Sequence, residues 1–87
     1  MKVLKFGAEY CGPCKVIKGW WQDIQDEMPD IQFVEYDADV DANYMVHYDI
    51  KSLPTIVIVD DEIGTEVSRY VGITTKEKLM EMINNVR

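Results

Sequence analysis

The chain has 87 residues, which is enough for one small globular domain over 1–87 and too few for two. Nine basic against sixteen acidic residues give a net charge of −7, and no cluster of Lys or Arg is present, so we expect neither nucleic acid nor an anionic membrane as a partner. Lys5 interrupts the apolar start of the chain, and we therefore expect no signal peptide, no membrane helix and a cytoplasmic location.

The first half of the chain predicts a strand, a helix and a second strand. The apolar run 3–6 is typical of a central strand. Apolar residues at three- and four-residue spacing predict a helix over 13–28, in which one of Trp20 and Trp21 packs in the core and the other lies near the surface. Alternation over 31–36 predicts a strand, which a β-α-β unit would place parallel to the first.

The second half predicts a short helix, a hairpin and a last helix. Asp39 or Asp41 is the expected cap of the short helix. Thr74 and Glu77 have the spacing of a capping box at the start of the last helix. The expected elements are a helix over 41–48, a strand over 56–59, a turn over 60–64, an antiparallel strand over 65–71 and a helix from 74 onward.

The only two cysteines, Cys11 and Cys14, are separated by Gly12 and Pro13 and follow the first predicted strand. A structural disulfide across so short a loop would stabilise little, because the entropic gain grows with loop length. A zinc site needs four ligands, and His47 is the only histidine, so a metal clip would have to be completed by a partner. Reversible dithiol chemistry is the favoured interpretation, with no metal and no other cofactor.

The segment Ala8-Glu-Tyr-Cys-Gly-Pro-Cys-Lys15 closely resembles the active-site segment of the thioredoxin family. Leu53-Pro54-Thr55 and Val71-Gly72 follow in the family's order, so the resemblance covers nearly the whole chain. It implies an α/β thioredoxin fold, a four-stranded mixed sheet with flanking helices, without the extra N-terminal strand and helix of full-length thioredoxins. It also implies a cis peptide bond between Leu53 and Pro54.

The resemblance further implies a thiol-disulfide oxidoreductase that reduces protein disulfides through a mixed disulfide and contributes to cell redox homeostasis. We expect Cys11 to be the nucleophile, because the thiolate attacks and a helix N-terminus favours negative charge. Cys14 would then resolve the mixed disulfide, and the two would form the redox disulfide. The substrate-binding residues implied by the family are Tyr10, Gly12, Pro13, Leu53, Pro54, Val71, Gly72 and Ile73.

Two departures from the family pattern concern charge and shape. Tyr10 stands where a tryptophan commonly precedes the first cysteine. Lys5 stands where thioredoxins typically carry a buried aspartate, and Glu35 where they typically carry a lysine. Burying either charge alone would cost several kcal/mol, so we expect the two to pair. The resemblance implies that Glu35 takes the part of the family's aspartate and accepts the proton of Cys14, with Lys5 as its charge partner. The alternative is that one or both side chains reach the rim and take no part in chemistry.

The expected partners are proteins that contain disulfides and a thioredoxin reductase, and the expected state is a monomer. Two other functions remain open from the sequence. The length of the chain suits a glutaredoxin-like protein reduced by glutathione. The same surface would also suit a non-catalytic thioredoxin-type subunit of a larger enzyme.

Overall fold

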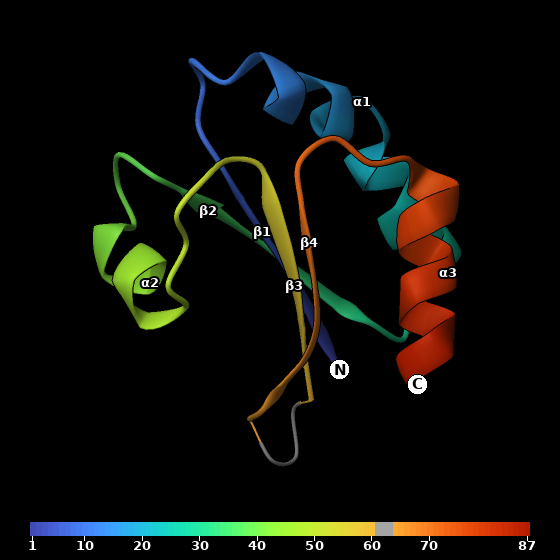
Figure 1. Cartoon of the computed structure of the whole chain (residues 1–87). Helices are drawn as coiled ribbons and strands as arrows, with labels where there is room; N and C mark the ends of the chain where they lie inside the picture. The colour runs from blue at the N-terminus through green and yellow to red at the C-terminus, as the bar shows by residue number, and fades with distance from the viewer. Residues whose placement is uncertain (61–63) are drawn as a thin grey trace.

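The computed structural model describes residues 1–60 and 64–87, in which one sheet lies between helices on both of its faces (Figure 1). Every predicted helix and strand is present, with ends that move by no more than two residues. The predicted turn over 60–64 includes 61–63, which lie outside the described residues. The elements are β1 (Lys2–Gly7), α1 (Gly12–Glu27), β2 (Gln32–Asp37), α2 (Ala42–His47), β3 (Thr55–Val59), β4 (Glu66–Val71) and α3 (Lys76–Val86).

The four strands are hydrogen-bonded in the order β2-β1-β3-β4. β1 and β2 run parallel, as predicted for strands joined by a helix, whereas β3 is antiparallel to both β1 and β4. β1 and β3 therefore occupy the centre of the sheet. All of β3 is buried, which explains its unbroken run of Ile and Val.

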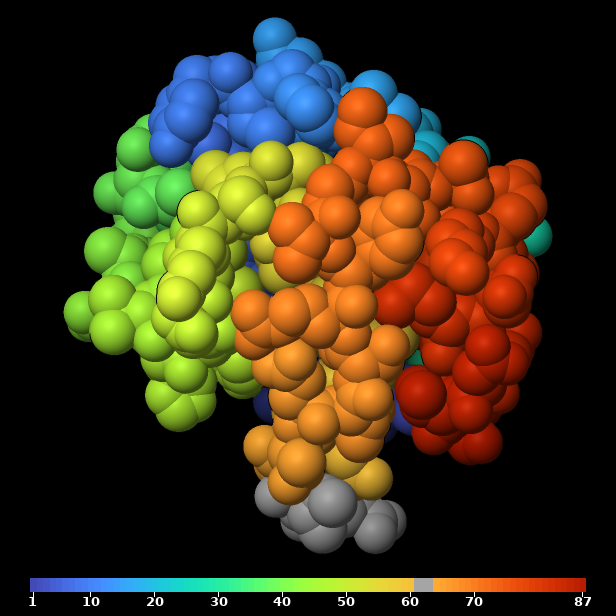
Figure 2. Space-filling model, viewed as in Figure 1, coloured from blue at the N-terminus to red at the C-terminus, as the bar shows by residue number. Residues whose placement is uncertain are grey.

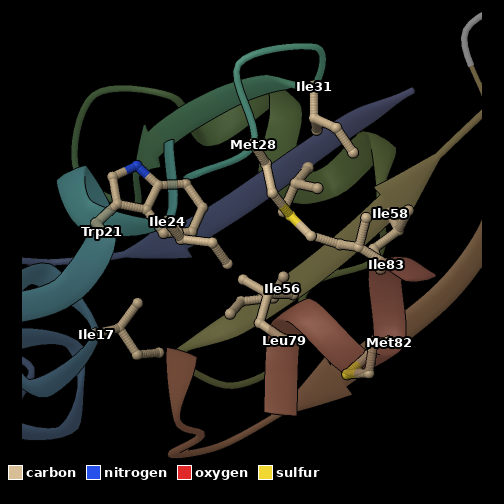
Figure 3. Close-up of a cluster of buried hydrophobic side chains, with 11 residues drawn as sticks. Ile17, Trp21, Ile24, Met28, Ile31, Ile56, Ile58, Leu79, Met82 and Ile83 are labelled. Carbon is tan, nitrogen blue, oxygen red and sulfur yellow. The ribbon is translucent and has the colours of Figure 1, made fainter. Parts of the chain in front are cut away.

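The alternation of side chains along the central strands divides the core between the two faces of the sheet. On one face, β1 and β3 pack against α1 and α3, where Leu79 and Ile83 are fully buried (Figure 3). On the other face, Leu4 and Phe6 contribute to a second cluster, which Met45 of α2 covers. Helices thus cover both faces of the sheet. The carboxyl ends of the parallel strands β1 and β2 lie at an edge that these helices leave open.

Two details of the helices bear on predictions made from the sequence. Trp21 is the buried tryptophan and Trp20 packs at the edge of the same cluster. Asp41 holds the cap position of α2, but its carboxylate accepts from the backbone N–H of Asp37 at 2.8 Å and does not cap the helix. Among the described residues, no helix has the length and apolar character needed to cross a membrane.

The predicted capping box at Thr74 is wrong by one residue. Thr75 is the cap of α3, and its hydroxyl oxygen accepts from the backbone N–H of Lys78 at 3.1 Å. Thr74 is instead buried, and its hydroxyl has no hydrogen-bond partner among the described residues. Thr74 is part of the core, and the helix therefore begins after Thr75.

Candidate active site

Cys11 caps the N-terminus of α1. Its backbone is extended, and its Sγ accepts a hydrogen bond from the backbone N–H of Cys14 at 3.2 Å. Pro13 lies in the first turn, where its missing N–H is not required. The N–H groups and the dipole at this helix end favour a negative charge on the sulfur of Cys11.

The two cysteines are joined as a disulfide, with their Cα atoms 5.3 Å apart. Cys11 is partly exposed, whereas only 7% of Cys14 is accessible. An incoming sulfur therefore meets Cys11 first, and Cys14 is held one helical turn inside.

Gly7, the last residue of β1, allows this close packing of Cys14. A Cβ atom at Gly7 would lie 3.2 Å from the Sγ of Cys14, which is tighter than nine in ten observed Cβ contacts. The strand predicted over 3–6 ends just before Gly7, and that prediction assigned Gly7 no role. Its position directly before the cysteine loop was the one available signal that its lack of a side chain serves the site.

Lys5 and Glu35 are brought together, as the sequence analysis expected. They are register partners on β1 and β2, and Lys5 Nζ lies 2.7 Å from Glu35 Oε1. The two ends differ in environment, because the side chain of Lys5 is 9% exposed and that of Glu35 is 55% exposed. The Lys5 ammonium also lies 4.8 Å from the centre of the Trp21 ring, a cation–π distance. The pair spans the boundary between core and solvent.

A pocket of about 410 Å³ adjoins the buried sulfur. Its wall includes Cys14 together with both members of the Lys5–Glu35 pair. Tyr36 also contributes, and burial together with the nearby tyrosines and Asp41 raises the pKa of its phenol, so it stays neutral at physiological pH. The remaining lining residues are Gly7, Ala8, Glu9, Lys15, Lys18 and Asp37.

The predicted substrate-binding residues gather at the same end of the molecule as the cysteines, where Figure 2 shows the first turn of α1 in blue, the segment before β3 in yellow and the end of β4 in orange. The Leu53–Pro54 bond is cis, as predicted. The carbonyl oxygen of Pro54 accepts from the N–H of Gly72 at 2.8 Å, and Gly72 has a φ of 107°, a conformation that favours glycine.

Several apolar side chains at this surface are exposed to solvent. Tyr10 is 71% exposed, Val71 55% and Ile73 54%. Leu53 is partly buried among the residues of the second cluster. Together with Pro54 and Gly72 they make up a largely apolar surface at the same end of the molecule as Cys11. We call this surface the cis-proline groove: Tyr10, Gly12, Pro13, Leu53, Pro54, Val71, Gly72 and Ile73.

Comparisons with known proteins agree with this geometry. The family model described as Thioredoxin matches residues 1–85. The chain is 37% identical over 83 residues to a thioredoxin of Mycoplasma genitalium, covering 95% of this chain and 79% of that one. It is 36% identical over 84 residues to a thioredoxin of Gallus gallus, covering 97% and 77%. The solved structure of Fasciola hepatica thioredoxin superposes with a TM-score of 0.88 at 31% identity, covering 99% and 80%.

The chain belongs to the thioredoxin family, whose members reduce protein disulfides. With the Cys11–Cys14 pair as its redox centre, it is a thiol-disulfide oxidoreductase. The predicted fold class and the predicted activity are both confirmed.

Proposed function

We propose that this protein reduces disulfides of other proteins in the cytoplasm, as a monomer, with Cys11 as the nucleophile and Cys14 as the resolving thiol. The Cys11 thiolate attacks one sulfur of the substrate disulfide, and the other sulfur leaves as a thiolate and takes up a proton. The Cys14 thiolate then attacks the Sγ of Cys11, which forms the Cys11–Cys14 disulfide and releases the second substrate thiolate. Two electrons pass to the substrate, and the protein leaves oxidised.

The observation that carries this assignment is the different accessibility of the two sulfurs at one helix N-terminus. Cys11 is reachable and lies where the helix stabilises a thiolate, whereas Cys14 is shielded until the mixed disulfide has formed. The cis-proline groove supports the same assignment. An extended substrate segment can pair with the backbone of Leu53 while its side chains contact Val71 and Ile73.

Glu35 is the proposed proton acceptor for Cys14. A buried thiol must lose its proton before it can attack, and Glu35 is a carboxylate on the wall of the pocket that Cys14 also lines. Its exposed end can pass the proton on to solvent, and its contact with the buried ammonium of Lys5 holds it in place.

Replacing Glu35 with Gln is expected to slow resolution by about 100-fold at pH 7, the lower end of the range for general acid–base catalysis. The amide keeps an oxygen for the ammonium of Lys5 but is not a base. Single-turnover reaction of the reduced protein with the aromatic disulfide dithiobis(nitrobenzoate) separates the two steps. Attack by Cys11 and resolution by Cys14 each release one coloured thiolate. The first phase should be unchanged and the second one slowed.

Glu9→Gln is the matched control, because Glu9 is an exposed carboxylate on the wall of the same pocket and has no contact with Lys5 in the described structure. It should leave both phases at the wild-type rate. A second phase of Glu35→Gln that is as fast as wild type would remove Glu35 from the mechanism and leave solvent as the acceptor.

A thioredoxin reductase is the proposed electron donor. The oxidised protein, supplied with purified thioredoxin reductase and NADPH, is expected to be reduced within minutes, whereas millimolar glutathione alone should leave most of the Cys11–Cys14 disulfide intact. Gel-shift labelling of free thiols measures both outcomes. Reduction by glutathione alone, without turnover by the reductase, would favour the glutaredoxin-like interpretation.

A further inference from the structure

The segment that leads from α2 to the cis-proline groove packs on the second core cluster through Tyr48 and Ile50, which are only partly buried. α2 is six residues long and none of them is buried. The chain leaves it through Asp49, which has a positive φ of 53°, and the N–H of Ile50 turns back to the carbonyl of Met45 at 2.8 Å. A non-glycine residue in this conformation costs energy and persists where its surroundings hold it.

Arg69 of β4 provides such a restraint from across the sheet. Its Nη2 donates to the carbonyl oxygen of Tyr48 at 2.6 Å, and its Nη1 reaches that of Asp49 at 3.4 Å. Arg69 lies 21 residues from Tyr48 in sequence, so this contact exists only in the folded chain. It satisfies carbonyl groups at the end of a helix, where a cation is favourable.

Glu66 holds the guanidinium in place. Its two oxygens accept from Nε and Nη2 of Arg69 at 2.8 and 2.7 Å, the paired geometry that fixes the plane of an arginine. This hydrogen bond also raises the pKa of Arg69 above its ordinary value, so the charge is permanent. The hydrogen bonds thus run from Glu66 through Arg69 to the carbonyl groups of Tyr48 and Asp49, at the end of α2.

Arg69 and Val71 lie two residues apart on β4 and therefore point to the same face of the sheet. Val71 forms one wall of the groove, and the segment that Arg69 holds leads into Leu53 and Pro54, which form the other. We propose that Arg69 is a positioning residue that fixes the segment leading into Leu53, the part of the groove that the pairing of β3 with β4 does not itself hold. This inference rests on the groove being the substrate surface.

Replacing Arg69 with Met, which keeps the apolar length but donates no hydrogen bond, is expected to raise the KM for insulin about tenfold, because displacing a binding element by a fraction of an ångström can cost this much. With dithiothreitol as the electron donor, kcat should stay within a factor of two, and the rate of alkylation of Cys11 should not change. Hydrogen exchange at the amide of Ile50 should become faster.

Arg69→Lys retains the positive charge and can donate to one of the two partners, Glu66 or Tyr48. We expect this variant to have a KM for insulin about threefold above wild type, between those of wild type and Arg69→Met. It also carries the test if Arg69→Met does not fold. Arg87→Met is the control, since Arg87 pairs with Asp30 far from the groove and its loss should leave KM unchanged.

Ile73→Asp separates this inference from the proposed function. A wild-type KM in Ile73→Asp would show that the groove does not bind substrate, and both proposals about it would fall. A raised KM in Ile73→Asp with a wild-type KM in Arg69→Met and Arg69→Lys would keep the groove and overturn the role of Arg69.

Discussion

Cys14→Ser is expected to stop the reaction at the mixed disulfide, so that the variant holds about one substrate molecule per chain and does not turn over. Cys11 remains able to attack because it keeps its place at the N-terminus of α1. No second sulfur lies within reach to displace the substrate. Non-reducing gels and mass spectrometry of the variant after incubation with insulin measure the trapped complex.

Cys11→Ser is the companion variant and should trap nothing, because Cys14 is shielded and does not meet a protein disulfide. Equal trapping by both variants would contradict the division of roles between the two cysteines. If Cys11→Ser and Cys14→Ser both retained the protein's function in the cell, the non-catalytic subunit would be the better interpretation, since that function needs the surface of the motif and not its sulfurs.

Phe6→Ala is expected to lower the free energy of unfolding by about 3–5 kcal/mol, the range for deleting a fully buried aromatic side chain. Phe6 has no accessible surface, and its ring lies 5.0 Å from that of Tyr36 and 5.6 Å from that of Tyr48. The substitution leaves a cavity between the sheet and α2. A domain of this size has a total stability of roughly 5–15 kcal/mol, so much of the margin would be lost.

Urea denaturation followed by circular dichroism measures this change. Val46→Ala is the control, because Val46 is 81% exposed on α2 and its truncation should stay within about 0.5 kcal/mol of wild type. A loss below about 1.5 kcal/mol for Phe6→Ala would mean that the surrounding rings close over the cavity and that α2 is not anchored through this side chain.

Local patterns in the sequence were sufficient for the elements and for the redox centre. Apolar periodicity depends on neighbouring residues, so it located every helix and strand to within two residues. The pair of Lys5 and Glu35 was also within reach, because parallel strands joined by one helix lie side by side and two opposite charges in them avoid the cost of separate burial.

Other features depend on which residues meet after folding. The capping-box spacing to Glu77 favoured Thr74 in the sequence, but Thr74 is buried in the folded chain and Thr75 caps the helix. The half-exposed position of Glu35, against a buried Lys5, depends on where the sheet ends and solvent begins. Local pattern cannot report such differences.

The sequence by itself determined that this is a one-domain α/β protein with a dithiol at the start of a helix, because spacing and periodicity are local properties of the chain. Only the tertiary structure decided that Gly7 leaves room for the sulfur of Cys14, that a pocket joins that sulfur to Glu35, and that Arg69 braces the approach to the groove. Each of these contacts joins residues from different structural elements, and their distances are set by the packing of the sheet and its helices.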